Sequence, residues 1–222
     1  AYDTAGNVVL RIDARGVAAS SSFDALDRLV RTEYSMAGAP AEVHAFEYDG
    51  GAGGAPHATG RLTKVVDPAA TTRWDYTAAG RVAVKSQQAD GVTLATTHDY
   101  DSAGQRIRMK TPSGQAIAYG YRNNRVASIA VNGVALISSV AGEPFGPPGA
   151  WQWGNGLFTF RDYDADGRIR GWELHNGASI LRNDLAWDAA DRITRIVDPA
   201  NPAREAAYQY DALDRLTLAQ RG

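Results

Sequence analysis

Short runs of alternating apolar and polar residues recur along the whole chain, and each run stops at a turn signal. Val8, Leu10 and Ile12 alternate with other residues, and Val82 and Val84 do so further on. An alternation of period two is typical of a β-strand with one buried face, whereas a helix requires a period near 3.6. No long amphipathic helical stretch accompanies these runs. The pattern therefore predicts an all-β protein built from short strands.

A seven-residue pattern closes many of these runs and recurs at regular intervals. It reads aromatic, Asp, two variable residues, Gly or Asp, Arg and an aliphatic residue, and residues 163–169 show it most clearly. The opening residue, here called the lead aromatic, returns every 21 to 28 residues, except for one interval of 42 that equals two steps of 21. The lead aromatics are Tyr2, Phe23, Tyr48, Tyr76, Tyr100, Tyr121, Tyr163, Trp187 and Tyr210. A period of this size predicts a repeat protein.

The second and fifth positions of the pattern predict a tight turn. An Asp or Thr side chain at the second position accepts a backbone N–H two residues on and nucleates the turn. The residues there are Asp3, Asp24, Asp49, Thr77, Asp101, Asp164, Asp188 and Asp211. The fifth position holds Gly or Asp, the residues that enter the left-handed region most readily, so we expect a positive φ there. The residues at this turn position are Gly6, Gly80, Gly104, Gly167, Asp27, Asp191 and Asp214.

An aliphatic residue after the turn predicts where the return strand begins. These residues are Val8, Leu29, Leu62, Val82, Ile107, Val126, Ile169, Ile193 and Leu216. Each copy is therefore expected to be an antiparallel β-hairpin of about 23 residues. One such unit has too few apolar side chains to offset the entropy of ordering it, so neighbouring hairpins must stack. We expect one continuous array over residues 1–222.

Two places depart from the repeat. After Asp49 the turn gains eight residues, 50–57, before the pattern resumes at Gly60; this glycine-rich insertion is expected to be a surface loop. Residues 135–160 fill the double interval without the signature. We interpret them as a degenerate repeat with a proline-rich turn at residues 143–148 and tryptophans at strand spacing.

Composition narrows the class of protein. The 222 residues carry a net charge of −2, which offers no field to attract nucleic acid, and no run of apolar residues is long enough to span a membrane. The absence of cysteine excludes disulfides and thiolate metal sites. The chain opens at Ala1 inside a repeat, without an initiator methionine or signal peptide. We therefore expect it to be a fragment of a longer polypeptide.

The signature resembles the YD repeats of the bacterial Rhs family, which also occur in the C component of insecticidal toxin complexes and in the animal teneurins. Residues 76–82, 163–169 and 210–216 match it best, and the stretch from Pro144 to Gly156 also resembles that family. The resemblance implies a curved ribbon of antiparallel hairpins that forms part of a spiral β-shell. In the bacterial members such a shell encloses a C-terminal toxin domain. The self-cleaving motif, the toxin domain and the targeting domain of the family have no counterpart in this sequence.

A calcium loop is the sharpest alternative interpretation of one repeat. Asp162, Asp164, Asp166 and Glu173 occupy positions 1, 3, 5 and 12 of the twelve-residue calcium-loop pattern, with Gly167 at position 6. Three Asp and a bidentate Glu could supply most of the oxygens that calcium requires. The repeat itself explains Asp164 and Gly167, and the flanks are strand-like where this calcium motif requires helices. The plain repeat turn is therefore the favoured interpretation, with no cofactor.

The tryptophans and arginines each allow two interpretations. Trp151, Trp153 and Trp172 lie off the repeat positions and could contact a glycan, although core packing is the simpler role. The arginines that follow the turns could form a basic stripe that binds a polyanion. We expect them instead to form an Arg–Asp ladder between neighbouring repeats, which fixes register more than it stabilises. They are Arg28, Arg61, Arg81, Arg168, Arg192 and Arg215.

The favoured hypothesis for function is non-catalytic. None of the four histidines has a partner at ligand spacing, and no nucleophile elbow is present. We expect a shell segment that encapsulates a toxin or effector polypeptide for delivery by a secreted or cell-surface bacterial protein that is made in the cytoplasm before export. The partners would be the remainder of the Rhs polypeptide, its enclosed toxin domain and possible secretion machinery, with no nucleic acid. The alternative is an extracellular recognition module that binds glycan or protein through the tryptophans and the 50–57 loop. The isolated fragment is expected to self-associate through its open edges.

Overall fold

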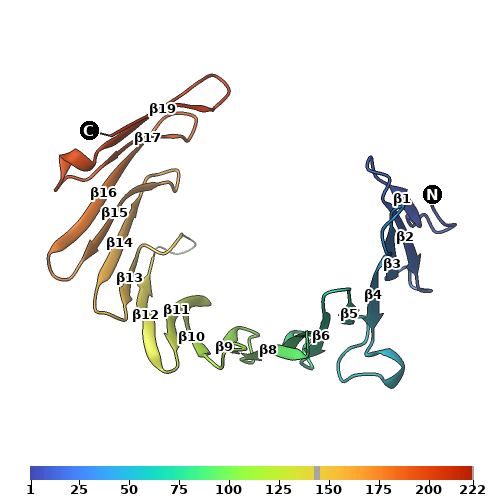
Figure 1. Cartoon of the computed structure of the whole chain (residues 1–222). Coiled ribbons are helices and arrows are strands. Elements are labelled where there is room, and N and C mark those ends of the chain that lie inside the picture. Colours follow the sequence, from blue (N-terminus) through green and yellow to red (C-terminus); the bar gives the residue numbers. More distant parts are fainter. Residues whose placement is uncertain (143–145, 222) are drawn as a thin grey trace. The chain divides into compact units, whose positions relative to one another are not determined.

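The computed structural model describes residues 1–142 and 146–221. Its backbone divides into two compact units, Ala1–Ala116 and Ile117–Gly222. Figure 1 labels the strands of both units.

The first unit holds nine strands and a short 3₁₀ turn, η1 (Gly51–Gly53), among the described residues. The strands are β1 (Leu10–Ile12), β2 (Ala18–Phe23), β3 (Leu29–Ser35), β4 (Glu42–Tyr48), β5 (Leu62–Val66), β6 (Thr71–Tyr76), β7 (Val82–Ala89), β8 (Val92–Tyr100) and β9 (Arg106–Lys110).

The second unit holds ten strands in its described part and the 3₁₀ turn η2 (Pro202–Arg204). The strands are β10 (Ala116–Arg122), β11 (Arg125–Val131), β12 (Val134–Ala141), β13 (Ala150–Trp153), β14 (Phe158–Tyr163), β15 (Ile169–His175), β16 (Ser179–Trp187), β17 (Ile193–Val197), β18 (Ala206–Tyr210) and β19 (Leu216–Arg221).

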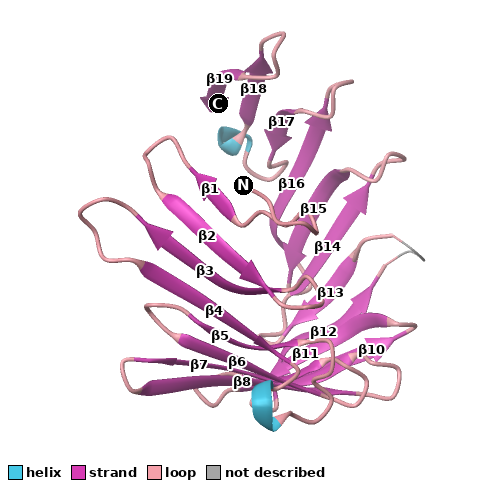
Figure 2. Cartoon of the chain, turned by 90° about the vertical axis from the view of Figure 1, so that its right-hand side faces the viewer, coloured by secondary structure: helices cyan, strands magenta, loops and turns pink. Residues whose placement is uncertain are grey.

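Within each unit every strand pairs antiparallel with the next one in the chain, as Figure 2 shows for β2 to β4 and for β14 to β16. The predicted array of antiparallel hairpins is confirmed. The sheet is a single open layer, and the helical residues described are confined to the two short 3₁₀ turns. No described helix has the length and apolar character needed to cross a membrane.

The register places the lead aromatic at the same point of every hairpin. Tyr163 pairs with Ile169, Trp187 with Ile193, and a register shift directly precedes each of these pairs. A shift of this kind leaves one extra residue on the return strand and increases the local twist. The same pairing of lead aromatic and return residue occurs at Phe23–Leu29, Tyr48–Leu62, Tyr76–Val82, Tyr121–Val126, Tyr210–Leu216 and, as an isolated bridge, Tyr2–Val8.

One predicted return residue is wrong. Ile107 was expected to start the return strand after Tyr100, but Tyr100 pairs with Arg106. The prediction required an aliphatic residue at this point. In hairpins with the short turn, such as Tyr76–Val82, the paired residue is the sixth after the lead aromatic, and here that residue is Arg106. The rule that every copy has an aliphatic at this point therefore fails in one copy.

The turns have the predicted backbone conformation. φ lies between 76° and 90° at Gly6, Gly80, Gly104 and Gly167. It is 57° at Asp27 and 61° at Asp191 and Asp214. A hydrogen bond from the N–H of this residue to the carbonyl of the second-position residue closes the turn, for example Gly167 to Asp164 at 3.0 Å. The hairpin at Tyr121 differs, because it has a tighter turn with positive φ at Asn123 and Asn124.

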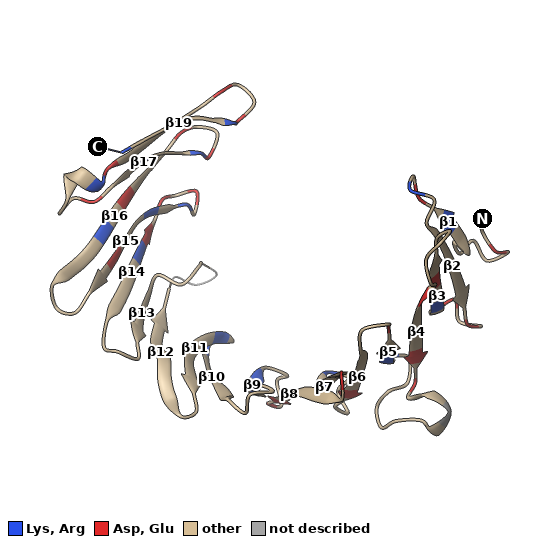
Figure 3. Cartoon of the chain, in the orientation of Figure 1, with Lys and Arg blue, Asp and Glu red and all other residues tan. Residues whose placement is uncertain are grey.

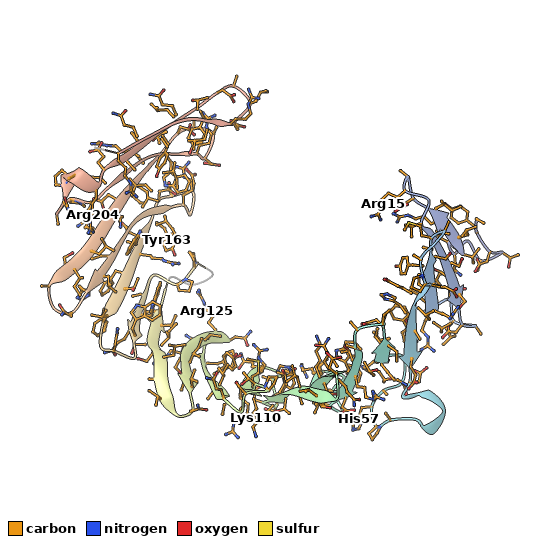
Figure 4. All side chains as sticks on the ribbon, viewed as in Figure 1. Arg15, His57, Lys110, Arg125, Tyr163 and Arg204 are labelled. Carbon is orange, nitrogen blue, oxygen red and sulfur yellow. The ribbon has the colours of Figure 1, made fainter. Side chains whose placement is uncertain are left out.

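The single layer leaves few side chains fully buried. Among the described residues Ala58, at 1% exposure, is the buried hydrophobic side chain, and Thr32, Thr63, Thr72, Thr159 and Asp198 are buried polar ones. The accessible surface is 14487 Å², compared with about 9,800 Å² for a compact monomeric protein of this mass. Figure 4 shows side chains standing out from both faces of the sheet. The hairpins are therefore held mainly by contacts between neighbours rather than by a central core.

The two predicted departures lie where the sequence places them. Residues 50–57 lengthen the turn between β4 and β5, and the N–H of Gly60 donates to the Asp49 carboxylate at 2.5 Å to close it. Strands β12, β13 and the start of β14 occupy the degenerate repeat, residues 135–160. Part of its predicted proline-rich turn, residues 143–145, lies outside the described residues.

Candidate functional site

The signature residues interlock each hairpin with the next, beginning with the turn aspartate. The carboxylate of Asp188 accepts the N–H groups of Ala190 and Arg192, and its second oxygen accepts the Nε–H of Arg192 at 2.8 Å. Asp24, Asp164 and Asp211 make the same three bonds with residues at the same spacing. One carboxylate therefore shapes the turn and aims the arginine side chain.

The lead aromatic reaches back to the preceding hairpin. The hydroxyl of Tyr, or the indole N–H of Trp, donates a hydrogen bond to the carbonyl of the return residue of that hairpin. The pairs are Tyr76 to Leu62 at 2.5 Å, Tyr100 to Val82 at 2.9 Å, Trp187 to Ile169 at 2.8 Å and Tyr210 to Ile193 at 2.9 Å. After the degenerate repeat, Tyr163 donates to the carbonyl of Pro148 at 2.9 Å instead. Both ring types supply one donor at the tip, which explains why Trp187 can replace Tyr.

The arginine of each turn covers the lead aromatic of the following hairpin. The distances from the guanidinium carbon to the ring centre are 4.4 Å for Arg28 and Tyr48, 5.7 Å for Arg61 and Tyr76, 5.8 Å for Arg81 and Tyr100, 5.8 Å for Arg168 and Trp187, and 4.9 Å for Arg192 and Tyr210. A guanidinium is attracted to an aromatic face by the ring quadrupole. The arginine therefore belongs to the contact between repeats.

The same arginines also meet the next turn. Arg192 binds Asp214 at 2.7 Å, and Arg168 binds Asp191. Arg28 binds Asp49 at 2.8 Å. The predicted Arg–Asp ladder between repeats is present at these three steps. Where the next turn has Gly80 or Gly104 instead, the preceding arginine lies against the glycine, in the space that a β-carbon would occupy.

These contacts lower the pKa of the turn carboxylates. The backbone N–H of Arg192 is the main cause at Asp188, and that of Arg28 at Asp24; burial acts in the opposite direction at both. At Asp211 the main cause is the backbone N–H of Arg215, followed by its guanidinium. The ionised form of each aspartate is thus the form that the folded turn prefers.

The proposed calcium ligands face arginines in the structure. Asp162 binds Arg170, and Asp164 and Asp166 both bind Arg168, at 2.7 and 3.1 Å. Across the part of the chain that the structure describes, no group of three or more His, Asp or Glu side chains is placed to hold a metal ion. Calcium binding by this loop stays a prediction, and a calorimetric titration with calcium is its direct test.

The three tryptophans predicted for glycan contact lie together. Trp151 and Trp153 on β13 and Trp172 on β15 line one concavity of about 610 Å³, here called the aromatic groove. Its other lining residues are Asn155, Leu157, Thr159, Arg161, Ile169, Leu174 and Leu185. The rings of Trp151 and Trp153 meet edge to face at 5.9 Å, and Arg161 lies 4.9 Å over Trp151. The groove is apolar and lies entirely within the second unit.

A second concavity of about 490 Å³, the charged recess, lies over β14, β15 and β16. Phe160, Asp162, Gly171, Glu173, Arg182 and Asp184 line it, together with Arg161, Arg170, Trp172 and Leu185. Figure 3 shows acidic and basic segments side by side on these strands. From the sequence, Asp162 and Glu173 were expected only as calcium ligands. The recess has no sequence signal, because cross-strand register brings its residues together.

These features define the class of protein: an open β-sheet assembled from hairpin repeats that are joined by one recurring contact. Residues 57–93 and 187–221 match the family model of the RHS repeat. The resemblance to the Rhs and YD-repeat family is confirmed by these two segments. A comparison with curated proteins gives no match.

Solved structures share the fold over nearly the whole chain. The structure of TcdB2-TccC3 superimposes with a TM-score of 0.87 at 17% sequence identity and covers 98% of this chain. A Photorhabdus luminescens Tc holotoxin pore structure gives a TM-score of 0.85, 17% identity and 98% coverage, and TcdB2-TccC3-Cdc42 gives 0.86, 16% and 97%. This chain spans 12 to 13% of the length of those chains. At such identity the likeness shows the fold alone.

Proposed function

We propose that this chain is a non-catalytic wall segment of a larger shell and that the shell separates a toxin or effector polypeptide from its surroundings until delivery. The observation that carries the proposal is the contact that recurs between hairpins, in which an aromatic donor and an arginine join one hairpin to the next in a sheet one layer thick. Each added repeat enlarges the surface of such a sheet without adding a core, as a wall requires. The fold shared with the TccC3-containing structures supports the same role.

The remainder of the shell and its enclosed polypeptide are the partners that this proposal requires. Extracellular delivery and export by secretion machinery follow from the same analogy with the Tc toxin structures. The aromatic groove offers a surface for the apolar side chains of a non-native polypeptide, because Trp153, Trp172 and Leu174 are only half-buried in a sheet with no second layer.

Binding of unfolded polypeptide tests the proposal. The 222-residue chain is titrated with a reduced and carboxymethylated protein that cannot fold, and in parallel with the native form of the same protein. A wall for non-native polypeptide binds the unfolded form at least about tenfold more tightly, because only that form exposes extended apolar segments. Trp172→Ala weakens this binding, whereas Tyr34→Ala, an aromatic change in the first unit, leaves it unchanged. Equal binding of both forms, or of neither, contradicts the proposal.

Recognition of a glycan by the three tryptophans is a second candidate. The observation in its favour is that Trp151, Trp153 and Trp172 converge on one groove although they lie off the repeat positions. The 50–57 loop belongs to the other unit and is a separate candidate contact. A glycan array probed with the unaltered chain and with Trp153→Ala tests it. An array without a binder, or one in which the variant binds equally, removes this candidate.

A further inference from the structure

The charged recess lies on the opposite face of the sheet from the aromatic groove. Successive side chains of a strand point to opposite faces. Thr159 lines the groove and the Arg161 guanidinium lies over Trp151 there, so Phe160 and Asp162 point to the other side. A row across three strands follows from the register, with Phe160 opposite Glu173 and Glu173 opposite Arg182. The next row on this face is Asp162, Gly171 and Asp184.

Gly171 makes the recess, because it leaves a gap in the middle of this second row. The residue is itself buried, and a β-carbon there would meet the Asp184 carboxylate at 3.1 Å. Arg170, in the bulge before it, turns onto the same face and donates its Nε–H to Asp162 at 2.9 Å. The floor of the recess is therefore backbone, and its rim is made of charged side chains.

One side of the recess is a flat aromatic wall. The ring of Phe160 stacks on His175 with 4.8 Å between ring centres and 17° between planes. His175 thus covers one face of the ring, and the other face is free to border the recess. Phe160 is 44% exposed although it is a large apolar residue within a strand. An open ring face beside polar groups is a surface on which the C–H face of a sugar ring packs well.

The rim presents both acceptors and donors in a fixed arrangement. Arg182 donates to Asp184 at 3.0 Å, and Arg170 holds Asp162, so these two pairs are already neutral. Glu173 lies opposite Arg182 and interacts with it electrostatically, but among the described residues it makes no hydrogen bond or close ion pair. Its carboxylate is free to accept hydroxyl donors. Of the three arginines that line the recess, Arg161 directs its guanidinium over Trp151 in the aromatic groove. The remaining three carboxylates and two guanidinium groups leave the rim with a net charge of −1, which disfavours an anionic ligand.

We propose that the charged recess over Gly171 is a binding site for a neutral saccharide, stacked on the free face of Phe160 and hydrogen-bonded by Glu173 and Arg182. A volume of about 490 Å³ lies within the range of small-ligand pockets. A neutral ligand with many hydroxyls uses every group of the rim without breaking the existing ion pairs. This inference depends neither on the wall proposal nor on the aromatic groove.

Saturation-transfer NMR and calorimetry on the whole chain test the site, with methyl glycosides of glucose, galactose and N-acetylglucosamine as probes and glucuronate as the anionic comparison. We expect at least one neutral probe to bind with a Kd of about 1 to 10 mM and glucuronate to bind at least about tenfold more weakly. Phe160→Ala should weaken binding of the neutral probe at least about tenfold. Glu173→Gln should raise glucuronate binding relative to the neutral probe, because it removes the excess charge.

Trp153→Ala is the matched control, since it removes a large ring from the opposite face. Unchanged saccharide binding by this variant, together with the loss in Phe160→Ala, supports the recess. Loss of binding in Trp153→Ala but not in Phe160→Ala would move the saccharide to the aromatic groove and overturn the inference. No binding of any probe up to about 50 mM also overturns it. Far-ultraviolet circular dichroism of both variants shows that the sheet is intact.

Discussion

The lead aromatic joins two neighbouring hairpins through three different interactions. Tyr210 pairs with Leu216 in its own hairpin, donates its hydroxyl to Ile193 of the preceding one and receives the guanidinium of Arg192 on its ring. Among the described residues no hairpin lies before Tyr2, and its side chain is 72% exposed with no hydrogen-bond partner for its hydroxyl. The aromatic is therefore needed for the contact between repeats rather than for the hairpin alone.

Tyr76→Phe and Tyr2→Phe separate these roles. Removing the hydroxyl of Tyr76 leaves the carbonyl of Leu62 without its donor, so we expect the free energy of unfolding to fall by about 1 kcal/mol. Tyr2→Phe should change it by less than about 0.3 kcal/mol, because that hydroxyl has no partner to lose. Urea denaturation monitored by tryptophan fluorescence measures both. Equal effects of the two changes would show that the hydroxyl bond contributes nothing.

Turn glycines differ in what a side chain would meet. Gly80 and Gly167 have nearly the same φ, 76° and 80°, so Gly→Ala costs about 1 kcal/mol of backbone strain at either position. At Gly80 the added methyl also displaces the Arg61 guanidinium, whereas Gly167 faces open space. We expect Gly80→Ala to lower the melting temperature more than Gly167→Ala. Gly80→Asp should recover part of the loss, since Asp191 and its equivalents accept such an arginine. Differential scanning calorimetry ranks the three variants.

Each hairpin tolerates variation in its turn as long as the pairing on either side is kept. The insertion of residues 50–57 leaves Tyr48 paired with Leu62, the same pairing that other repeats make with a short turn. The Asp49 carboxylate still accepts the N–H of Gly60 across the insertion. The hairpin is therefore defined by its strands and its signature residues, and the loop is an addition to them.

Deletion of residues 50–57 joins Asp49 to Ala58 and restores the sequence Tyr-Asp-Ala-Thr-Gly-Arg-Leu, which is the uninterrupted signature. We expect the shortened chain to fold, with a melting temperature within about 3 °C of that of the parent, because loop closure depends weakly on length. Thermal unfolding followed by circular dichroism checks this. A matched deletion of residues 58–65, which removes most of β5, should abolish cooperative unfolding. Loss of folding in the first deletion would mean that the loop is structural.

The turn carboxylates make stability depend on pH. Their folded-state pKa values are depressed, at Asp188 chiefly by the backbone N–H of Arg192 and at Asp24 by that of Arg28. A depressed pKa contributes stability that is present above the unfolded pKa and is lost as pH falls through the folded one. We expect the melting temperature to be level between about pH 8 and 5 and to fall below about pH 4, where aspartates protonate. A rise in stability on acidification would contradict this assignment. Asp188→Asn should flatten the acid limb.

Each unit is a layer of sheet with few buried side chains among its described residues, so its edges and faces remain available. β19 is exposed along its length, including Leu216 and Leu218 at 54% and 40%, and it pairs on one side with β18. A long exposed edge strand is a template for pairing with another chain. The two faces of the second unit carry the aromatic groove and the charged recess, so this unit presents these two surfaces and the β19 edge to partners.

Self-association through β19 is the prediction that belongs to this scale. We expect the sedimentation coefficient of the isolated chain to rise with protein concentration. Leu218→Lys places a charge on the exposed edge and should reduce the association without lowering the melting temperature. Leu185→Lys, within the aromatic groove, is the control that should leave edge pairing unchanged. A concentration-independent monomer would show that β19 does not pair in solution.

The repeat, the hairpins and the turn conformations could all be predicted from the order of the amino acids. The reason is that these depend on local chemistry: period-two alternation, Asp or Thr beside a turn, and Gly or Asp where φ is positive. The Arg–Asp ladder could be predicted because several copies place the two residues at one spacing, and it is present at three steps. Ile107 was misassigned because the spacing from Tyr100 sets the paired residue, which is Arg106 and need not be aliphatic.

Which residues from different strands meet became known only from the assembled sheet. The cross-strand register brings Phe160, Glu173 and Arg182 into one row, and no periodicity within a strand records that row. The bulge at Arg170 turns its side chain toward Asp162, which changes the interpretation of a calcium-like pattern. The meeting of Trp151, Trp153 and Trp172 likewise depends on three strands lying side by side. Register is a property of paired strands, so surfaces built across strands appear only when the sheet is assembled.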